Sequence, residues 1–300
     1  MNQEQGILLE SGTNEVEIVE FHAGGSYYGI NVIKVKEIIM PVPVTAIPHA
    51  HPYIEGIIQL RGEVLPVVNL RKVLGQQVQM GENDKFIVTE FNQQKIVFHV
   101  DSVTKIHRFS WGQIEKPSEM YTGASSHITG VIKNGGDMIL MLDFEKIIAE
   151  INPQTSIRVE DVKKLGKRER SNKRILIAED SGLLRGLLHD TLLEAGYEKI
   201  EFFENGKEAY DYLVGIAESG KNVTDEVQLV ITDIEMPLMD GHHLTKKIKQ
   251  SSELNVLPVI IFSSLITDTL RHKGEMVGAD AQISKPEINQ LILSIDEHVL

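Results

Sequence analysis

The feature that most constrains the fold is an alternation of short apolar runs and helix-patterned segments in the carboxyl-terminal half of the chain. The apolar runs cover residues 174–178, 199–203, 227–232, 258–262 and 281–284. Between them, apolar residues recur at helical spacing, as in Leu184, Leu187, Leu188 and Leu192. Near-continuous apolar strands that alternate with helices predict a doubly wound parallel sheet, whose ligands bind where the strands end.

Four of these runs are followed directly by residues that can bind metal or phosphate. Glu179 and Asp180 follow the first run, Asp233 the third, Ser263 the fourth and Lys285 the fifth. The carboxyl ends of parallel strands meet at one edge, so we expect all five side chains in one crevice. Three carboxylates there would repel one another without a cation, and an oxygen-only ligand set suits Mg²⁺. The sequence therefore predicts Mg²⁺ held by the carboxylates, Asp233 as nucleophile for a phosphoryl group, and Ser263 and Lys285 as phosphate contacts.

These residues resemble the receiver domain of two-component response regulators. The matching motifs are E-D at 179–180, D-I-E-M-P-L-M-D-G at 233–241, S-S at 263–264 and K-P at 285–286. Ser263 lies 30 residues after Asp233, and Lys285 lies 22 after Ser263, as in that family. The resemblance covers residues 173–300 and implies a flavodoxin-like α/β fold. It also implies phosphorylation of Asp233 by a histidine kinase, a main-chain carbonyl ligand to Mg²⁺ from Glu235, and a cis Lys285–Pro286 bond.

Other interpretations of the same residues are weaker. An Asp at a strand end is often only a helix cap, and phosphatases or dehalogenases also use a strand-end Asp and a Lys. Such enzymes would use a second Asp as general acid two residues after the nucleophile, and this chain has Glu235 there. We therefore expect no enzymatic activity except slow self-dephosphorylation. Two departures from the receiver pattern are Gln282, where many receivers carry an aromatic residue, and residues 218–226, which we expect to be an inserted surface loop.

The amino-terminal half is rich in short β-type runs and repeats itself. The runs cover residues 15–22, 27–32, 57–60, 64–70, 85–91, 95–100, 128–133 and 138–144. The segment that begins at Gly56 aligns without gaps to the one that begins at Gly130, and a fainter match joins the segments from Tyr28 and Ile96. Such a repeat predicts two related five-stranded barrels.

No catalytic set is evident in this half. His49 and His51 could bind a metal, but without a third ligand an exposed loop is the simpler interpretation. Arg61 and Gly62 form a tight turn that we expect to be a hairpin tip, with Arg61 as a recognition or bracing residue.

Residues 60–71, L-R-G-E-V-L-P-V-V-N-L-R, together with Gly56 and the repeat, resemble the CheW family of chemotaxis adaptors over about residues 14–150. That resemblance implies binding to chemoreceptor tips and to the histidine kinase CheA. A CheW-like domain followed by a receiver resembles the arrangement of CheV proteins. We expect a coupling domain over residues 1–152, a linker over 153–172 and a receiver over 173–300.

Composition excludes several other classes. Both main parts are acidic, with net charges of −6 over residues 1–150 and −10 over 173–300, so nucleic acid is an unfavourable partner. The basic stretch 158–170 is expected to be a solvated linker. There is no Cys and no long apolar segment, which predicts a cytoplasmic protein with no direct membrane insertion. The resemblance to CheW and CheV proteins implies that it is located at chemoreceptor arrays.

The sequence thus predicts a phosphorylation-modulated adaptor between chemoreceptors and CheA. The alternative is a phosphate sink, in which the receiver drains phosphoryl groups from the kinase and the amino half serves only for localisation.

Overall fold

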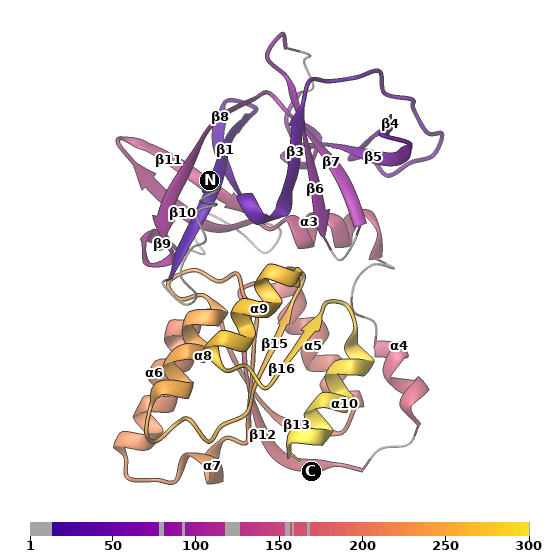
Figure 1. The fold of residues 1–300 in the computed structure, drawn as a ribbon. Coiled ribbons are helices and arrows are strands. Elements are labelled where there is room, and N and C mark those ends of the chain that lie inside the picture. The colour runs from indigo at the N-terminus through magenta and orange to yellow at the C-terminus, as the bar shows by residue number, and fades with distance from the viewer. Residues whose placement is uncertain are drawn as a thin grey trace, which may run out of the picture. The chain divides into compact units, whose positions relative to one another are not determined.

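The computed structural model describes residues 14–77, 81–91, 94–117, 127–153, 157, 159–166 and 169–299 (Figure 1). They form two compact units. The amino-terminal unit comprises Val16–Phe109 and Gln113–Ser156, and the carboxyl-terminal unit is chiefly Ile157–Leu300. No helix in the described part of the chain is both long enough and apolar enough to cross a membrane.

The carboxyl-terminal unit contains a five-stranded parallel sheet in the order β13-β12-β14-β15-β16. Its strands are β12 (Ser171–Ala178), β13 (Tyr197–Phe203), β14 (Leu229–Thr232), β15 (Val259–Ser263) and β16 (Ala281–Ser284). Its helices are α4 (Val159–Val162), α5 (Gly182–Glu194), α6 (Gly206–Glu218), α7 (Val223–Glu226), α8 (Gly241–Gln250), α9 (Asp268–Val277) and α10 (Ile288–Val299). The predicted doubly wound α/β fold is confirmed.

Alternate residues of each buried strand face opposite helix layers. Ile175 and Ile177 of β12 pack in the core formed with α5 and α10, whereas Leu176 and Ala178 pack in the core formed with α6 and α8. Figure 1 shows these two layers on opposite faces of the sheet. Burial of one aliphatic side chain is worth about 1.5–3 kcal/mol, so both faces of the strands hold the sheet in place.

Two segments differ from their predicted state because they carry apolar residues that pack. The range 218–226, expected as a surface loop, contains helix α7, whose Val223 is buried in the α6–α8 core. The range 153–172, expected as a linker, contains α4 and a 3₁₀ turn at Lys163–Leu165. Ile157 and Val162 pack there against α5 and α10. The basic stretch is therefore not solvated along its whole length.

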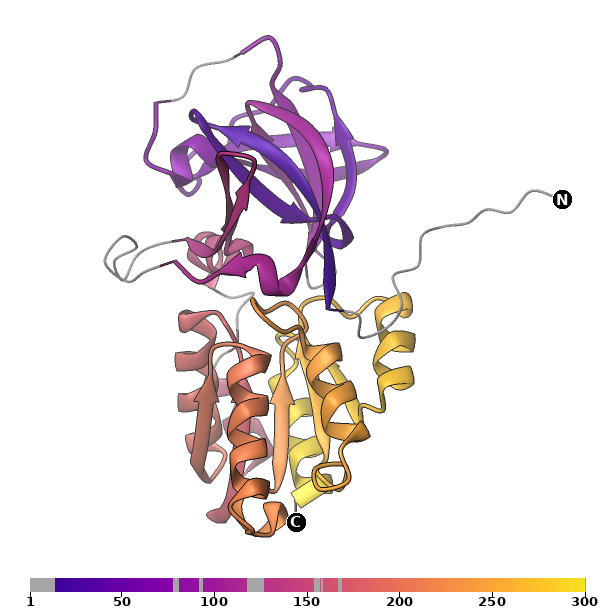
Figure 2. The same cartoon turned by 90° about the vertical axis from the view of Figure 1, so that its left-hand side faces the viewer.

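The amino-terminal unit consists of two curved sheets (Figure 2). The six-stranded sheet has the order β8-β1-β2-β11-β10-β9, with β1 (Glu15–Ala23), β2 (Ser26–Asn31), β8 (Ser102–Ser110), β9 (Ile114–Glu115), β10 (Ile128–Asn134) and β11 (Asp137–Leu142). The five-stranded sheet has the order β3-β6-β7-β5-β4, with β3 (Val35–Ile39), β4 (Ile54–Leu60), β5 (Glu63–Asn69), β6 (Lys85–Phe91) and β7 (Gln94–Val100). Helices α1 (Leu70–Val73) and α3 (Phe144–Ile151) follow β5 and β11.

The internal repeat is visible in the pairing register. The first copy supplies β4, β5 and α1, and the second supplies β10, β11 and α3. Val67 of β5 pairs in parallel with Val97 of β7, and Met141 of β11 pairs in parallel with Gly29 of β2. The two pairs are equivalent in the repeat, because Val67 of the first copy corresponds to Met141 of the second, and Gly29 corresponds to Val97. Each of these parallel pairs thus joins a strand of one repeat copy to a strand of the other. The expected mostly-β architecture is confirmed: the two predicted five-stranded barrels correspond to the two sheets, except that one sheet has a sixth strand, β9, and that β3, β8 and β9 lie outside the predicted β-type runs.

A buried charged network crosses the five-stranded sheet. His99 on β7 is 2% exposed, its Nδ1 lies 2.7 Å from Glu55 Oε2, and its Nε2 lies 3.0 Å from Asp84 Oδ2. Arg71 donates to the other oxygen of Asp84 at 2.9 Å. Burial alone lowers the pKa of His99, but the hydrogen bonds and negative charges of Glu55 and Asp84 outweigh burial and raise this pKa above its ordinary value.

We predict that protonated His99 stabilises the amino-terminal unit in a pH-dependent way. Its folded pKa lies above the unfolded value of about 6.5, so its contribution is fully present below that pH and is lost as pH rises through the folded pKa. His99→Gln leaves Glu55 without this cation and Asp84 with Arg71 alone, and should lower the free energy of unfolding by about 3 kcal/mol at pH 6. Calorimetric unfolding of the full chain at pH 6 and pH 9 should show a smaller difference from the wild type at pH 9.

His189→Gln is the matched control, because His189 lies on the surface of α5 with its side chain 49% exposed. It should change the free energy of unfolding by no more than about 0.5 kcal/mol at either pH. A His99→Gln effect of equal size at pH 6 and pH 9 would contradict a charged His99.

Candidate functional site

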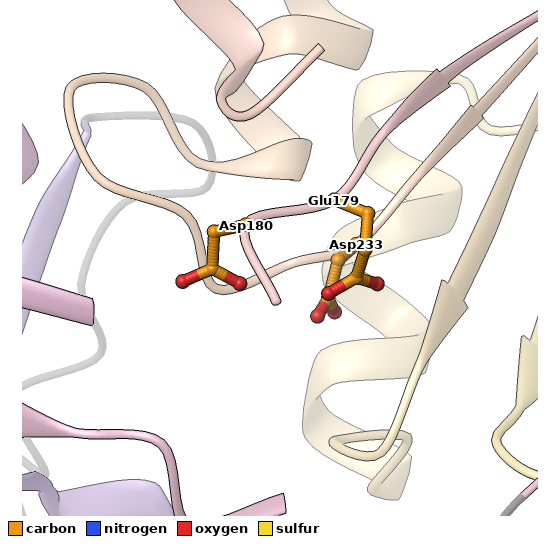
Figure 3. Close-up of side chains that lie close together, drawn as sticks. All are labelled: Glu179, Asp180 and Asp233. Carbon is orange, nitrogen blue, oxygen red and sulfur yellow. The ribbon is translucent and has the colours of Figure 1, made fainter. Parts of the chain in front are cut away.

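Three carboxylates meet at one edge of the parallel sheet. Strands β12 and β14 pair with Ala178 opposite Thr232, and Asp233 N continues this ladder by donating to Ala178 O at 2.9 Å. The residues that follow each strand therefore start at the same level. One carboxylate oxygen from each of Glu179, Asp180 and Asp233 lies within 4.8 Å of the others (Figure 3).

Lys285 links two of these carboxylates. Its Nζ donates to Glu179 Oε2 at 2.8 Å and to Asp233 Oδ2 at 2.7 Å. The three side chains are only 2–4% exposed. Charges that are removed from water need such partners, since an unpaired buried charge is very costly. The ammonium therefore fixes both carboxylates in the crevice.

The backbone around Lys285 positions its side chain. Lys285 N donates to Ser263 O at 3.0 Å, which extends the parallel pairing of β15 and β16 beyond the pair Ser263 and Ser284. The Lys285–Pro286 peptide bond is cis, as the sequence predicts. Lys285 therefore enters the crevice from the strand next to the one that ends in Ser263.

Ser263 and Glu235 lie in the loops of the same edge. Ser263 is 1% exposed, and its Oγ accepts a hydrogen bond from Leu265 N at 3.3 Å. That bond uses a lone pair and leaves the O–H able to donate to a phosphoryl oxygen. Glu235 is half-buried in the loop after Asp233. The roles of Ser263 as a phosphate contact and of the Glu235 carbonyl as a metal ligand stay predictions.

The loop after Asp233 returns closely to the strand end. Asp233 Oδ1 accepts from Ile234 N at 2.6 Å, and Gly241 N donates to Ile234 O at 2.9 Å. A Cβ at Gly241 would lie 1.9 Å from Asp233 O, so a side chain there would displace the loop. Asp240 caps α8 by accepting from His243 N at 2.8 Å, and burial raises the pKa of Asp240 to about 6.

The donor set fits a hard divalent cation. Carboxylate oxygens from Glu179, Asp180 and Asp233 converge, Asp180 is the more exposed of the three, and the group contains no nitrogen or sulfur ligand. Mg²⁺ prefers such oxygen ligands and keeps several of its waters, for which a half-exposed carboxylate leaves room. Among the residues that the structure describes, these three carboxylates form the candidate metal site.

Sequence reasoning did not identify two residues next to this site. Arg185 on α5 donates through Nη1 to the carbonyl oxygens of both Glu179 and Asp180, and through Nη2 to Glu204. Glu204 directly follows β13, the strand whose end was expected to carry no site residue. The available signal was the position of Glu204 at the same sheet edge, together with an Arg in the first turn of the preceding helix.

Gln282 of β16 lies against α9. Its Nε2 donates to Arg271 O at 2.7 Å, and a Cβ at Gly274 would lie 2.2 Å from its Oε1. The amide thus occupies space that Gly274 leaves open on the helix. Gln282, at the position where many receivers carry an aromatic residue, therefore packs against α9.

In the amino-terminal unit, Arg61 and Gly62 form the turn between β4 and β5, with φ of 51° and 89°. Arg61 donates to Glu37 Oε2 of β3 at 2.8 Å while its side chain stays 78% exposed. The turn borders a cavity of about 480 Å³ lined by Lys36, Glu37, Leu60, Arg61, Glu63, Leu65, Val88, Glu90 and Lys95. The bracing contact is thus present, and the coupling role of the turn stays a prediction.

His49 and His51 lie in the segment between β3 and β4. His49 is exposed, and His51 Nδ1 accepts from Tyr53 N at 3.3 Å. Neither belongs to a group of candidate metal ligands in the described part of the chain.

Comparison with known proteins places both units in families. Residues 17–152 match the CheW-like domain family, and residues 175–296 match the response regulator receiver domain family. The chain is 31% identical to chemotaxis protein CheV3 of Helicobacter pylori over 288 residues, which is 91% of each chain. Among solved structures, it is similar to the scaffolding protein TtCheW of Thermoanaerobacter tengcongensis (27% identity, TM-score 0.41, 47% of this chain and 90% of that one). It is also similar to CheY4 of Vibrio cholerae (25% identity, TM-score 0.36, 43% of this chain and 100% of that one).

Proposed function

This chain belongs to the CheV family of chemotaxis proteins, and we propose that it couples chemoreceptors to the histidine kinase CheA under the control of a phosphoryl group on Asp233. The chain is a chemotaxis adaptor that carries a receiver domain. The observation that supports phosphorylation best is the buried Lys285 ammonium between Glu179 and Asp233, at an edge where a third carboxylate is also present.

In the proposed transfer, a carboxylate oxygen of Asp233 forms a bond to phosphorus while the phosphorus–nitrogen bond of a phosphohistidine in the kinase breaks. The leaving imidazole takes up a proton from solvent. Mg²⁺, held by Glu179, Asp180, Asp233 and the Glu235 carbonyl, would neutralise charge on the transferred group. The charge of the Asp233 carboxylate moves onto the phosphoryl oxygens. Lys285, already bonded to that side chain, can then hold one of them.

The energy of these contacts suffices for a switch. Phosphorylation replaces one carboxylate charge by a group of about −1.5 to −2 with three strong acceptor oxygens. Moving a two-state population from 1:99 to 99:1 requires about 5.5 kcal/mol of differential binding. Charge-assisted hydrogen bonds are worth about 1.5–3 kcal/mol each. Contacts from Lys285, the Ser263 hydroxyl and one main-chain N–H therefore supply energy of the required size.

The proposed docking surface is the face around the β4–β5 turn. Leu60, Leu65 and Val88 line the cavity beside the turn, and three ion pairs surround them. These pairs are Arg61–Glu37, Lys95–Glu63 and Lys36–Glu90. An apolar centre with a charged rim is the general form of a protein interface, and exposed ion pairs are weak enough to exchange for pairs with a partner.

We predict that Asp233→Asn abolishes labelling of the chain by phosphorylated CheA and leaves its binding to receptor and kinase intact. The amide keeps the shape of the side chain and removes the nucleophilic oxygen pair. Radiolabelled phosphoryl transfer and co-sedimentation with receptor arrays measure the two properties. Asp225→Asn, on the exposed side of α7, is the matched control and should label as the wild type does. Persistent labelling of the Asp233 variant would falsify the phosphoacceptor assignment.

A substitution that distorts the β4–β5 turn should weaken binding to partners and leave phosphoryl uptake unchanged, the reverse of Asp233→Asn. Gly62→Val places a β-branched residue at φ 89° and distorts the turn, so co-sedimentation with kinase or receptor should fall at least tenfold while phosphoryl uptake is unchanged. The internal repeat offers a matched control, since Gly136 occupies the equivalent place in the β10–β11 turn at φ 107°. Equal loss of binding in Gly62→Val and Gly136→Val would assign the loss to general damage of the unit, and unchanged binding in both would refute this docking surface.

A further inference from the structure

Arg185 binds the backbone of the loop that carries two of the proposed metal ligands. A single guanidinium nitrogen, Nη1, lies 2.8 Å from the carbonyl oxygens of both Glu179 and Asp180. The other terminal nitrogen, Nη2, lies 2.9 Å from Glu204 Oε1, and Glu204 stands at the end of the neighbouring strand β13. Arg185 therefore ties the loop between β12 and α5 to the loop between β13 and α6.

The positive charge of Arg185 lies at an unfavourable place, so its hydrogen bonds must offset the cost. Arg185 is in the first turn of α5, where the helix dipole disfavours positive charge. Its side chain is 22% exposed and reaches back past the start of the helix to the two carbonyls. The carboxylate of Glu204 balances its charge. The planar fork of Arg suits one fixed arrangement of several acceptors, which a Lys ammonium does not reproduce.

We propose that Arg185 is a positioning residue for the Mg²⁺ site, an inference that rests on the metal site of the proposed function. By hydrogen bonding to the carbonyl oxygens of Glu179 and Asp180, Arg185 fixes the orientation of these two peptide groups. The orientation of the backbone in turn directs the two ligand side chains. Glu204 holds the guanidinium in this place. Groups that orient metal ligands from behind typically change metal affinity by about 10–100-fold when they are removed.

The sign of the effect separates positioning from simple electrostatics. A guanidinium close to a cation site repels the cation, so removal of the charge alone would strengthen Mg²⁺ binding. Loss of positioning would weaken it. Arg185→Met removes both charge and hydrogen bonds, and Arg185→Lys retains the charge but loses the fork. Positioning predicts weaker binding in both variants.

Calorimetric titration of the full chain with MgCl₂, without any phosphoryl donor, tests the inference. We expect Arg185→Met to raise the dissociation constant about tenfold, Arg185→Lys to raise it by a smaller factor, and Glu204→Gln to raise it two- to threefold because the carboxamide still accepts the hydrogen bond. The shift of the unfolding temperature by Mg²⁺ should shrink in the same order. Arg174→Met is the matched control, because Arg174 of β12 contacts Tyr212 and Glu226 rather than the loop, and it should bind Mg²⁺ as the wild type does.

The outcomes are distinguishable from failure of the proposed function. If the wild type takes up no Mg²⁺, the metal site itself is wrong. If the wild type binds Mg²⁺ and Arg185→Met binds it equally or more tightly, the positioning role is refuted and the proposed function is unaffected. Weaker binding by Arg174→Met to the same extent would also refute a specific role of Arg185.

Discussion

The site depends on one interaction, the ion pairing of the Lys285 ammonium with Glu179 and Asp233. These charges directly follow β16, β12 and β14, and all three are almost fully buried. The pairing therefore requires that the strand ends lie level, which the parallel register of the sheet provides. It also determines the chemistry, because a new charge on Asp233 would immediately change the partners of Lys285. A phosphoryl group on Asp233 would thus act directly on ion pairs that are already formed in the fold.

The amino-terminal unit is held together in a different way. Its two repeat copies exchange strands, so that the parallel pairs Val67–Val97 and Met141–Gly29 hold distant parts of the sequence together. The buried His99 network adds a charged connection across the five-stranded sheet. The turn at Arg61 stays exposed on this sheet, as the proposed docking surface requires. In the proposed function, binding and stability therefore depend on different residues of this unit.

Much of this could be predicted because the signals were local. Strand ends followed by Asp, Glu, Ser and Lys identify the edge of the sheet, and the internal repeat predicts two related β structures. The strands β3 and β8 were missed because they are half-exposed and contain no fully buried residue, so they show little apolar alternation. The packing of Ile157 and Val162 on α5 and α10 was missed because basic residues surround these two apolar ones. Arg185 was missed because two of its acceptors are main-chain carbonyls, and its third acceptor, Glu204, follows a strand whose end was expected to carry no site residue.

The most direct test of the account is co-sedimentation of the full chain with receptor arrays and CheA, with kinase activity measured in the same samples. The samples would contain Mg²⁺ with or without beryllofluoride, a mimic of the phosphoryl group on Asp233. We predict that the chain binds the arrays and that beryllofluoride changes either its binding or the kinase activity, whereas the Asp233→Asn chain does not respond. Binding and activity that are indifferent to beryllofluoride would contradict the account and favour a phosphate sink, and absence of binding would contradict the adaptor role.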